Sequence, residues 1–236
     1  MARSDRVALV YAVAFVGFLV LPAAFRTQAP APFPAGFYWQ EVIDLFTPLV
    51  LIPLGWYLCA LDDERIPGTR LQRLLFLVLA ALWVEGQGMH LAANSIGRPW
   101  EHLAVPTGAL AHYYDEVLSH YLWHVGILGV WGLAIGRSLA APTAEGRPTR
   151  VAGIAGAIVL GVAWWMVLIE SGTAPLDIPL TIIGVALVAV AGRRRLASRP
   201  IAAILGGAGA LTLLLVAGWA VCWGGRLPQF TEVGLL

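Results

Sequence analysis

The sequence has no lysine, only two cysteines and little charge of either sign. Charged residues make up 12% of its 236 positions, roughly half of the fraction that is usual in soluble globular domains. This composition excludes a soluble globular domain. The formal net charge of +1 provides no strongly basic surface, which argues against nucleic acid as a partner.

Several motifs of redox proteins are also missing. The chain contains no CxxCH, so covalent attachment of haem is excluded, and it lacks the ExxH repeat of ferritin-like proteins. Five histidines are too few for the histidine-rich motifs of membrane desaturases. We expect Cys59 and Cys222 to lie near opposite membrane faces, where they cannot form a disulfide.

Long apolar runs dominate what is present. Hydrophobic residues make up 59% of the chain and the mean hydropathy is +0.77. A run of about 20 apolar residues crosses the hydrocarbon core of a bilayer, which is about 30 Å thick. The sequence therefore predicts one all-α domain, a polytopic integral membrane protein with seven transmembrane helices. The predicted spans are about 7–25, 38–61, 71–96, 113–136, 150–171, 176–192 and 200–223.

The arginines indicate the orientation of these spans, because basic residues collect on the cytoplasmic side of a membrane. Twelve of the 15 basic residues fall at alternate helix ends that would face the cytoplasm. The three at the opposite ends are Arg26, Arg98 and Arg226. We therefore expect a multi-pass protein of the cell's inner (plasma) membrane, with the N-terminus in the cytoplasm and the C-terminus outside.

Polar residues interrupt the third and fourth predicted spans. The third span ends in WVEGQGMHLAANSIG and the fourth begins with HYYDEVLSHYLWH. A carboxylate or imidazole placed in hydrocarbon without a partner costs several kcal/mol, so such residues indicate a functional site. Glu116, His120 and His124 are four residues apart and share one helix face.

Depth in the membrane pairs residues of the two spans. At a rise of about 1.5 Å per residue, His90 lies roughly 9 Å and His120 roughly 10 Å below the outer helix ends. Glu85 and His124 both come out at about 16 Å. If the two helices are antiparallel neighbours, His90 lies beside His120 and Glu85 beside His124. Gly86 and Gly88 remove side-chain bulk, which favours close approach of a neighbouring helix or a substrate to the backbone.

Three imidazoles with an open fourth position are a common ligand set for zinc. We predict His90, His120 and His124 as metal ligands. Such a metal lowers the pKa of its bound water toward about 7 and polarises a carbonyl group, which suits hydrolysis. The sequence thus favours a metal-dependent enzyme that hydrolyses a lipid or another amphiphile near the outer face.

Four further residues are candidates for a catalytic role. Glu85 and Glu116 are candidate proton shuttles. Asp115 and Ser119 are candidates for orienting the metal ligands. Asp115 lies off the face that carries the histidines, near the helix start, where capping of the helix is its alternative role.

The combination of seven helices, three histidines, a carboxylate and a serine resembles the superfamily that contains alkaline ceramidases and adiponectin-receptor-like proteins. His120 and His124 match the HxxxH pair of that family, and His90 corresponds to the third ligand, on a different helix. In the family the HxxxH pair lies in the last helix, whereas here it lies in the fourth. The resemblance implies zinc and hydrolysis of a lipid amide.

Other functions fit the same residues. A redox protein with haem, copper or non-haem iron is one alternative, either alone or as a subunit of a larger membrane complex. A proton or cation transporter is another, although no inverted repeat supports a carrier. The carboxylate and histidine pairs also fit a purely structural role. Whether Glu41, Asp44, Glu170 and Asp177 join the site is left open by the sequence.

Overall fold

The computed structural model describes residues 3–20, 38–64, 67–98, 105–141, 150–192 and 196–235, and these residues form helices and no β-strand. The elements are α1 (Arg3–Phe15), η1 (Val16–Val20), α3 (Trp39–Leu45), α4 (Thr47–Leu58), α5 (Arg70–Gly97), α6 (Pro106–His112), η3 (Tyr113–Ser119), α7 (His120–Ala140), α8 (Arg150–Glu170), α9 (Ala174–Gly192), η4 (Leu196–Ser198) and α10 (Pro200–Cys222).

Six helical segments are long and apolar enough to cross a membrane, which confirms the predicted class of helical membrane protein. They are Trp39–Leu58, Arg70–Gly97, Pro106–Ala140, Gly153–Glu170, Ala174–Ala191 and Pro200–Cys222. The first predicted span is a shorter apolar helix over the described residues, Arg6–Val20. At 1.5 Å per residue it covers about 22 Å, less than the hydrocarbon core. The total of seven spans and their orientation therefore stay predictions.

Two of the spans differ from the predicted helices. The fourth begins at Pro106 and not at residue 113. Proline is favoured at the first helical position, because it has no N–H that needs an acceptor. The second is divided at Phe46 into α3 and α4. Pro48 has no backbone N–H to donate to Asp44, so the regular hydrogen bonding of the helix is interrupted at this point.

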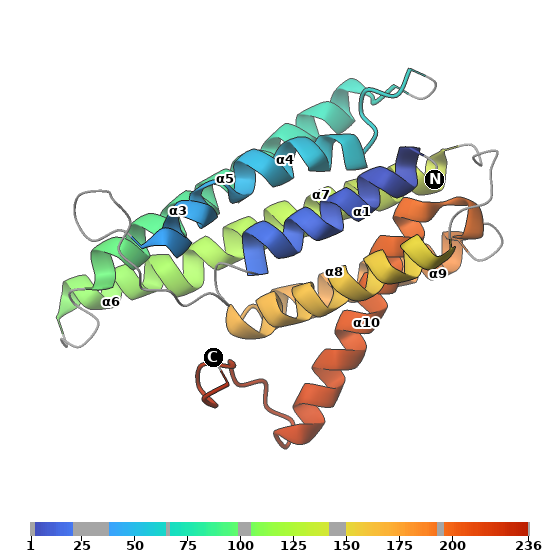
Figure 1. Cartoon of the computed structure of the whole chain (residues 1–236). Coiled ribbons are helices and arrows are strands. Elements are labelled where there is room, and N and C mark those ends of the chain that lie inside the picture. The colour runs from blue at the N-terminus through green and yellow to red at the C-terminus, as the bar shows by residue number, and fades with distance from the viewer. Residues whose placement is uncertain are drawn as a thin grey trace.

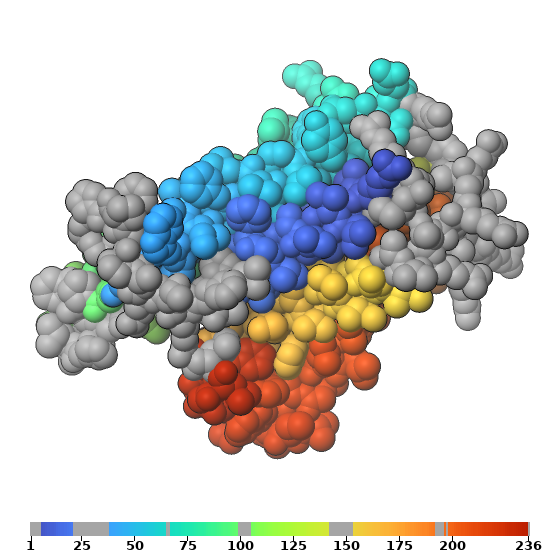
Figure 2. All heavy atoms as spheres, in the orientation of Figure 1, coloured from blue at the N-terminus to red at the C-terminus, as the bar shows by residue number. Residues whose placement is uncertain are grey.

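Most of the long helices run alongside one another, and α10 is tilted away from the others (Figure 1). Helix α5 packs against α7, α8 packs against α10, and α1 contacts both α4 and α8. In the space-filling view α1 (dark blue) lies between α4 and α8, and the C-terminal tail (dark red) lies against α10 (Figure 2). We call one end of the bundle the cavity end. It is formed by η1, α3, the second half of α5, η3, the first turn of α7, the end of α8 and the C-terminal tail.

Two glycines set the contact between α5 and α7. A Cβ on Gly86 would lie 2.6 Å from the carbonyl oxygen of Ser119, and a Cβ on Gly126 would lie 2.7 Å from that of Leu79. Only glycine allows the two backbones to approach this closely. The predicted close approach of a neighbouring helix is therefore confirmed at Gly86 and wrong at Gly88, where a Cβ would meet no atom of the described residues within 4 Å. The contact at Gly86 brings the histidine segments of both helices together.

Below the cavity end, toward the opposite end of the helices, the bundle is filled by aromatic side chains. The Trp131 indole N–H donates to the hydroxyl of Tyr11 at 2.8 Å. The ring centroid of Trp131 lies 5.5 Å from that of Phe15 and 5.0 Å from that of Trp164. All four side chains are buried. This packing separates the polar residues of the cavity end from the other end of the bundle.

Candidate functional site

Three histidines form a row inside the cavity end. The ring centroids of His90 and His120 are 5.1 Å apart, and those of His120 and His124 are 6.3 Å apart. His90 comes from α5 and the other two come from α7. The predicted neighbourhood of His90 and His120 is confirmed, because antiparallel helices with a fixed rise bring residues of equal depth together.

His124 is held by residues at the start of α9. Its Nδ1 lies 2.6 Å from Asp177 Oδ2 and 2.9 Å from Thr173 Oγ1. Thr173 Oγ1 donates to the same oxygen of Asp177 at 2.7 Å, and Ser171 Oγ lies 2.8 Å from Thr173 Oγ1. His124, Thr173 and Asp177 are completely buried. The segment 170–177 is thus a part of the site that the sequence had left open.

This network assigns a tautomer to His124. The hydroxyl of Thr173 donates its proton to Asp177, so both oxygens that face Nδ1 act as acceptors. The ring proton therefore sits on Nδ1, and Nε2 keeps a lone pair. Within the described part of the chain, the buried Nε2 has no hydrogen-bond partner. His124 is consequently oriented with one free basic nitrogen.

His90 faces a second carboxylate. Its Nδ1 lies 2.6 Å from Asp115 Oδ1. Asp115 belongs to η3, where the hydrogen bonds run from residue i to i+5 and each turn takes more residues than in an α-helix. This wider turn brings Asp115 toward the face of His120. The expectation that Asp115 lies off that face is therefore wrong, because it assumed a regular α-helix.

The third histidine has a carboxylate nearby as well. His120 Nδ1 lies 3.8 Å from Glu116 Oε2, one turn earlier on the same helical segment. Each imidazole of the row thus has its Nδ1 turned toward an Asp or Glu side chain. In metal centres such outer carboxylates orient histidine ligands and increase their basicity.

A cavity of about 360 Å³ lies beside this row. It is lined by Leu19, Gln40, Glu41, Asp44, Gln87, His90, Leu91, Asn94, Glu116, His120, Trp123, Val167, Glu170, Ser171, Gln229 and Thr231. Glu41, Asp44 and Glu170 therefore join the site, together with Glu116. Helical period explains the contribution of α5, because Gln87, His90, Leu91 and Asn94 share one face.

One wall of the cavity is fixed by Glu41. This buried carboxylate pairs with Arg98 and accepts hydrogen bonds from Ser95 Oγ at 2.8 Å and from the backbone N–H of Tyr38 at 2.7 Å. The guanidinium of Arg98 also lies 4.2 Å from the centroid of the Tyr38 ring. These contacts join the start of α3 to the end of α5, so the wall is held at both helices.

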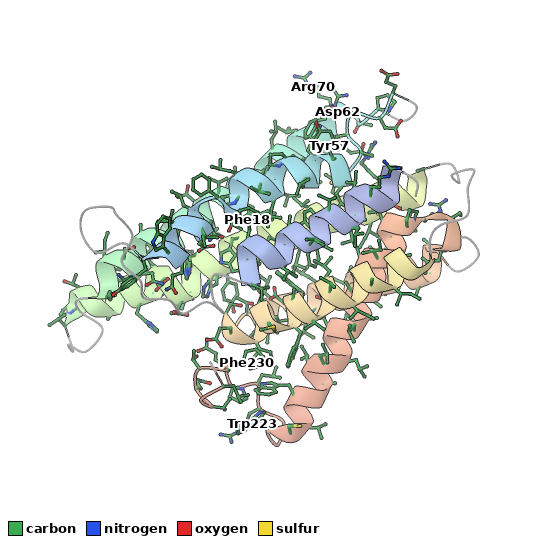
Figure 3. All side chains as sticks on the ribbon, viewed as in Figure 1. Phe18, Tyr57, Asp62, Arg70, Trp223 and Phe230 are labelled. Atoms are coloured by element: carbon green, nitrogen blue, oxygen red, sulfur yellow. The ribbon has the colours of Figure 1, made fainter. Side chains whose placement is uncertain are left out.

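The C-terminal tail forms another wall. Glu170 Oε2 accepts hydrogen bonds from the backbone N–H groups of Phe230 and Thr231, at 2.9 and 3.3 Å. The Phe230 ring packs against Trp219 with ring centroids 5.0 Å apart. Phe230 and Trp223 lie at the end of the molecule opposite Asp62 and Arg70 (Figure 3). Thr231 reaches the cavity from this anchored tail.

Three of the four predicted catalytic residues do not line the cavity: Glu85, Asp115 and Ser119. Glu85 is exposed on α5, because it points about 140° away from His90 around the helix. The expected contact of Glu85 with His124 is wrong, and Asp177 takes that position. Ser119 is completely buried and donates to the carbonyl oxygen of Asp115. Its backbone lies against Gly86, so it serves the packing of α5 on α7.

The side chains of the histidine row bear on the predicted metal site. Within the described ranges, no three His, Cys, Asp or Glu side chains are placed to hold a metal ion as they stand. Coordination of one metal ion by His90, His120 and His124 would require rotation of the three rings. The unpartnered Nε2 of His124 and the carboxylates at Nδ1 fit such a ligand set. Metal binding by these residues stays a prediction.

The chain matches no protein-family model, no curated protein and no solved structure. The resemblance to alkaline ceramidases thus rests on the residues described above, and the function is argued from the site.

Proposed function

We propose that this protein is a membrane-embedded, metal-dependent hydrolase that acts on a lipid or another amphiphile. The observation that carries the proposal is the row of His90, His120 and His124, in which every Nδ1 faces a carboxylate. A histidine held in this way presents Nε2 to a ligand. Zinc is the first choice, and iron, copper or haem are the alternatives. The proposed location is the inner (plasma) membrane.

The carboxylates divide into two groups with different tasks. Asp177 and Asp115 lie at 2.6 Å from their histidines, and the hydrogen bond of Asp177 orients the ring of His124. Glu116 lines the cavity, and its side chain is 38% exposed. Its carboxylate is therefore placed to accept a proton from a water molecule in the cavity. A bound divalent metal would supply Lewis acidity and activation of water at this position.

The cavity walls suit an amphiphilic substrate. Leu19, Leu91 and Val167 give the cavity an apolar part, beside the polar side chains of α3, α5 and the tail. The alkyl part of a substrate would lie on this apolar part, while its polar group points toward the histidine row. Orientation of this kind contributes to catalysis by holding the reacting bond in place.

Hydrolysis fits this geometry better than transport. The polar residues occupy the cavity end, and the buried aromatic side chains of Tyr11, Phe15, Trp131 and Trp164 lie between them and the other end. A conducting pathway needs polar groups or water across the whole membrane. A redox function is distinguished from hydrolysis by the identity of the metal, because zinc has no redox chemistry.

Metal analysis of the detergent-purified protein tests the proposal. We expect about one zinc ion per chain, and loss of this ion in His90→Ala, His120→Ala and His124→Ala. His112→Ala is the matched control, because His112 is an exposed imidazole outside the row. A protein without metal whose triple alanine variant keeps its activity would contradict the ligand assignment. Iron, copper or a Soret band would favour the redox alternative.

A further inference from the structure

We infer that the cavity binds amphiphiles through a primary ammonium group, recognised by Asp44, Glu116 and the side-chain oxygen of Gln87. The substrate class would then be a cationic amphiphile with a hydrolysable carbonyl bond. This second statement rests on the proposed function, whereas the binding preference does not.

The charge of the cavity wall is the first observation. Four carboxylates line it, from Glu41, Asp44, Glu116 and Glu170. Arg98 pairs with Glu41, and the described lining residues include no arginine, while the chain has no lysine. The wall keeps three further carboxylates. Its lining also includes His90 and His120, and a positive charge on His90 would be offset by Asp115, whose carboxylate lies 2.6 Å from the imidazole. A carboxylate or phosphate head group would be repelled here, and an ammonium group attracted.

An unpartnered acceptor is the second, independent observation. Gln87 is 3% exposed and lines the cavity, and its Oε1 has no hydrogen-bond partner in the described ranges. The Gln87 side chain also bonds to Asp44, and a carboxylate can only accept, so the amide nitrogen is the donor. The amide oxygen is thus left for a ligand with an N–H or O–H group.

Together the two observations define the head group more closely. Three negative side chains favour a cation, and Gln87 Oε1 requires a hydrogen-bond donor. A primary ammonium offers both, whereas a quaternary ammonium offers the charge alone. Even with a divalent cation bound at the histidines, the wall would keep a formal negative charge. The preference for a cationic head group therefore holds with and without metal.

Calorimetric titration of the full-length protein in a neutral detergent with a chelator tests the inference. The probes are octylammonium, octyltrimethylammonium and octanoate at pH 7, which share one chain length. We expect octylammonium to bind about tenfold more tightly than octanoate, because the carboxylates of the wall attract an ammonium group and repel a carboxylate. Octyltrimethylammonium should bind with intermediate affinity.

Variants identify the groups responsible. Asp44→Asn and Glu116→Gln should each weaken binding of octylammonium several-fold, because each removes one negative charge. Gln87→Leu should abolish the preference for the primary over the quaternary ammonium. Glu85→Gln is the matched control, since it removes a carboxylate from the exposed face of the same helix. It should leave all three affinities unchanged. Partition of the probes into micelles is the same for every variant, so differences between variants report on the cavity.

Two results would overturn the inference. One is binding of octanoate that equals or exceeds that of octylammonium in the wild-type protein, which needs no variant to fold. The other is an equal loss of affinity in Glu85→Gln and Glu116→Gln. Since the titration involves neither metal nor turnover, an ammonium preference in a protein that proves free of metal would refute the proposed hydrolase alone.

Discussion

The Nδ1 atom of His124 and the Oδ2 atom of Asp177 lie 2.6 Å apart, and neither side chain is exposed to solvent. The two residues are 53 positions apart in the chain. Thr173 joins the pair through hydrogen-bonding contacts to both members. This contact links α7 to α9, and it turns the free Nε2 of His124 away from the carboxylate.

Asp177 should control both metal affinity and stability. We expect Asp177→Asn to weaken zinc binding by about 10–100-fold, because an amide orients His124 without increasing its basicity. Asp177→Ala should lower the free energy of unfolding by about 3 kcal/mol, because it breaks a buried pair. Competition titration and thermal unfolding in detergent measure the two effects. Glu64→Gln, an exposed acid in the loop after α4, is the control. Unchanged zinc affinity in Asp177→Asn would restrict Asp177 to a structural role.

Gly86 and Gly88 form a matched pair on one helix. A Cβ on Gly86 would lie 2.6 Å from backbone atoms of Ser119 and Trp123, whereas a Cβ on Gly88 meets nothing within 4 Å. Gly86→Ala should therefore destabilise the protein by about 1–3 kcal/mol and separate His90 from His120. Gly88→Ala should be neutral or slightly stabilising, because alanine is the better helix former. Equal melting temperatures of the two variants would contradict the close contact of α5 with α7.

Glu170 should hold the C-terminal tail on the cavity. Glu170→Ala removes the acceptor of the Phe230 and Thr231 N–H groups, so we expect trypsin to cut after Arg226 several-fold faster than in the wild-type protein. Hydrogen bonds to a charged group contribute about 1.5–3 kcal/mol each. Mass spectrometry follows the cleavage. Glu232→Ala is the control, because Glu232 accepts a hydrogen bond within the tail, from the N–H of Gln229. Equal cleavage rates for wild type and Glu170→Ala would rule out this anchor.

The two cysteines should differ in reactivity. Cys59 is completely buried and its thiol donates to the carbonyl oxygen of Val130 at 3.6 Å, so a thiol reagent does not reach it. Cys222 is exposed. A maleimide should therefore label the purified protein once, at Cys222, and Cys222→Ser should abolish labelling.

The same labelling tests the predicted orientation. On intact cells a membrane-impermeant maleimide should reach Cys222, because the positive-inside distribution of arginine places the C-terminus outside. Labelling that appears only after the cells are opened would reverse the orientation.

The class of helical membrane protein and the depth of the histidines along their helices could be predicted, because both depend on local properties of the sequence. The length of an apolar run determines whether a helix can cross the bilayer, and a fixed rise per residue places His90 level with His120. The close approach at Gly86 followed in the same way from the absence of a side chain. The division of the second span at Phe46 was missed, although Pro48 was its signal.

The sequence by itself thus determined a bundle of membrane helices with a histidine row at one end. Only the tertiary structure decided which carboxylates serve that row. Glu85 and Gln87 are two positions apart, and the rotation of α5 against its neighbours turns Gln87 inward and Glu85 outward. Asp177 reaches His124 from α9, and Asp115 reaches His90 through the π-turn of η3. Helix rotation and side-chain partners result from packing between distant segments, which local periodicity does not specify.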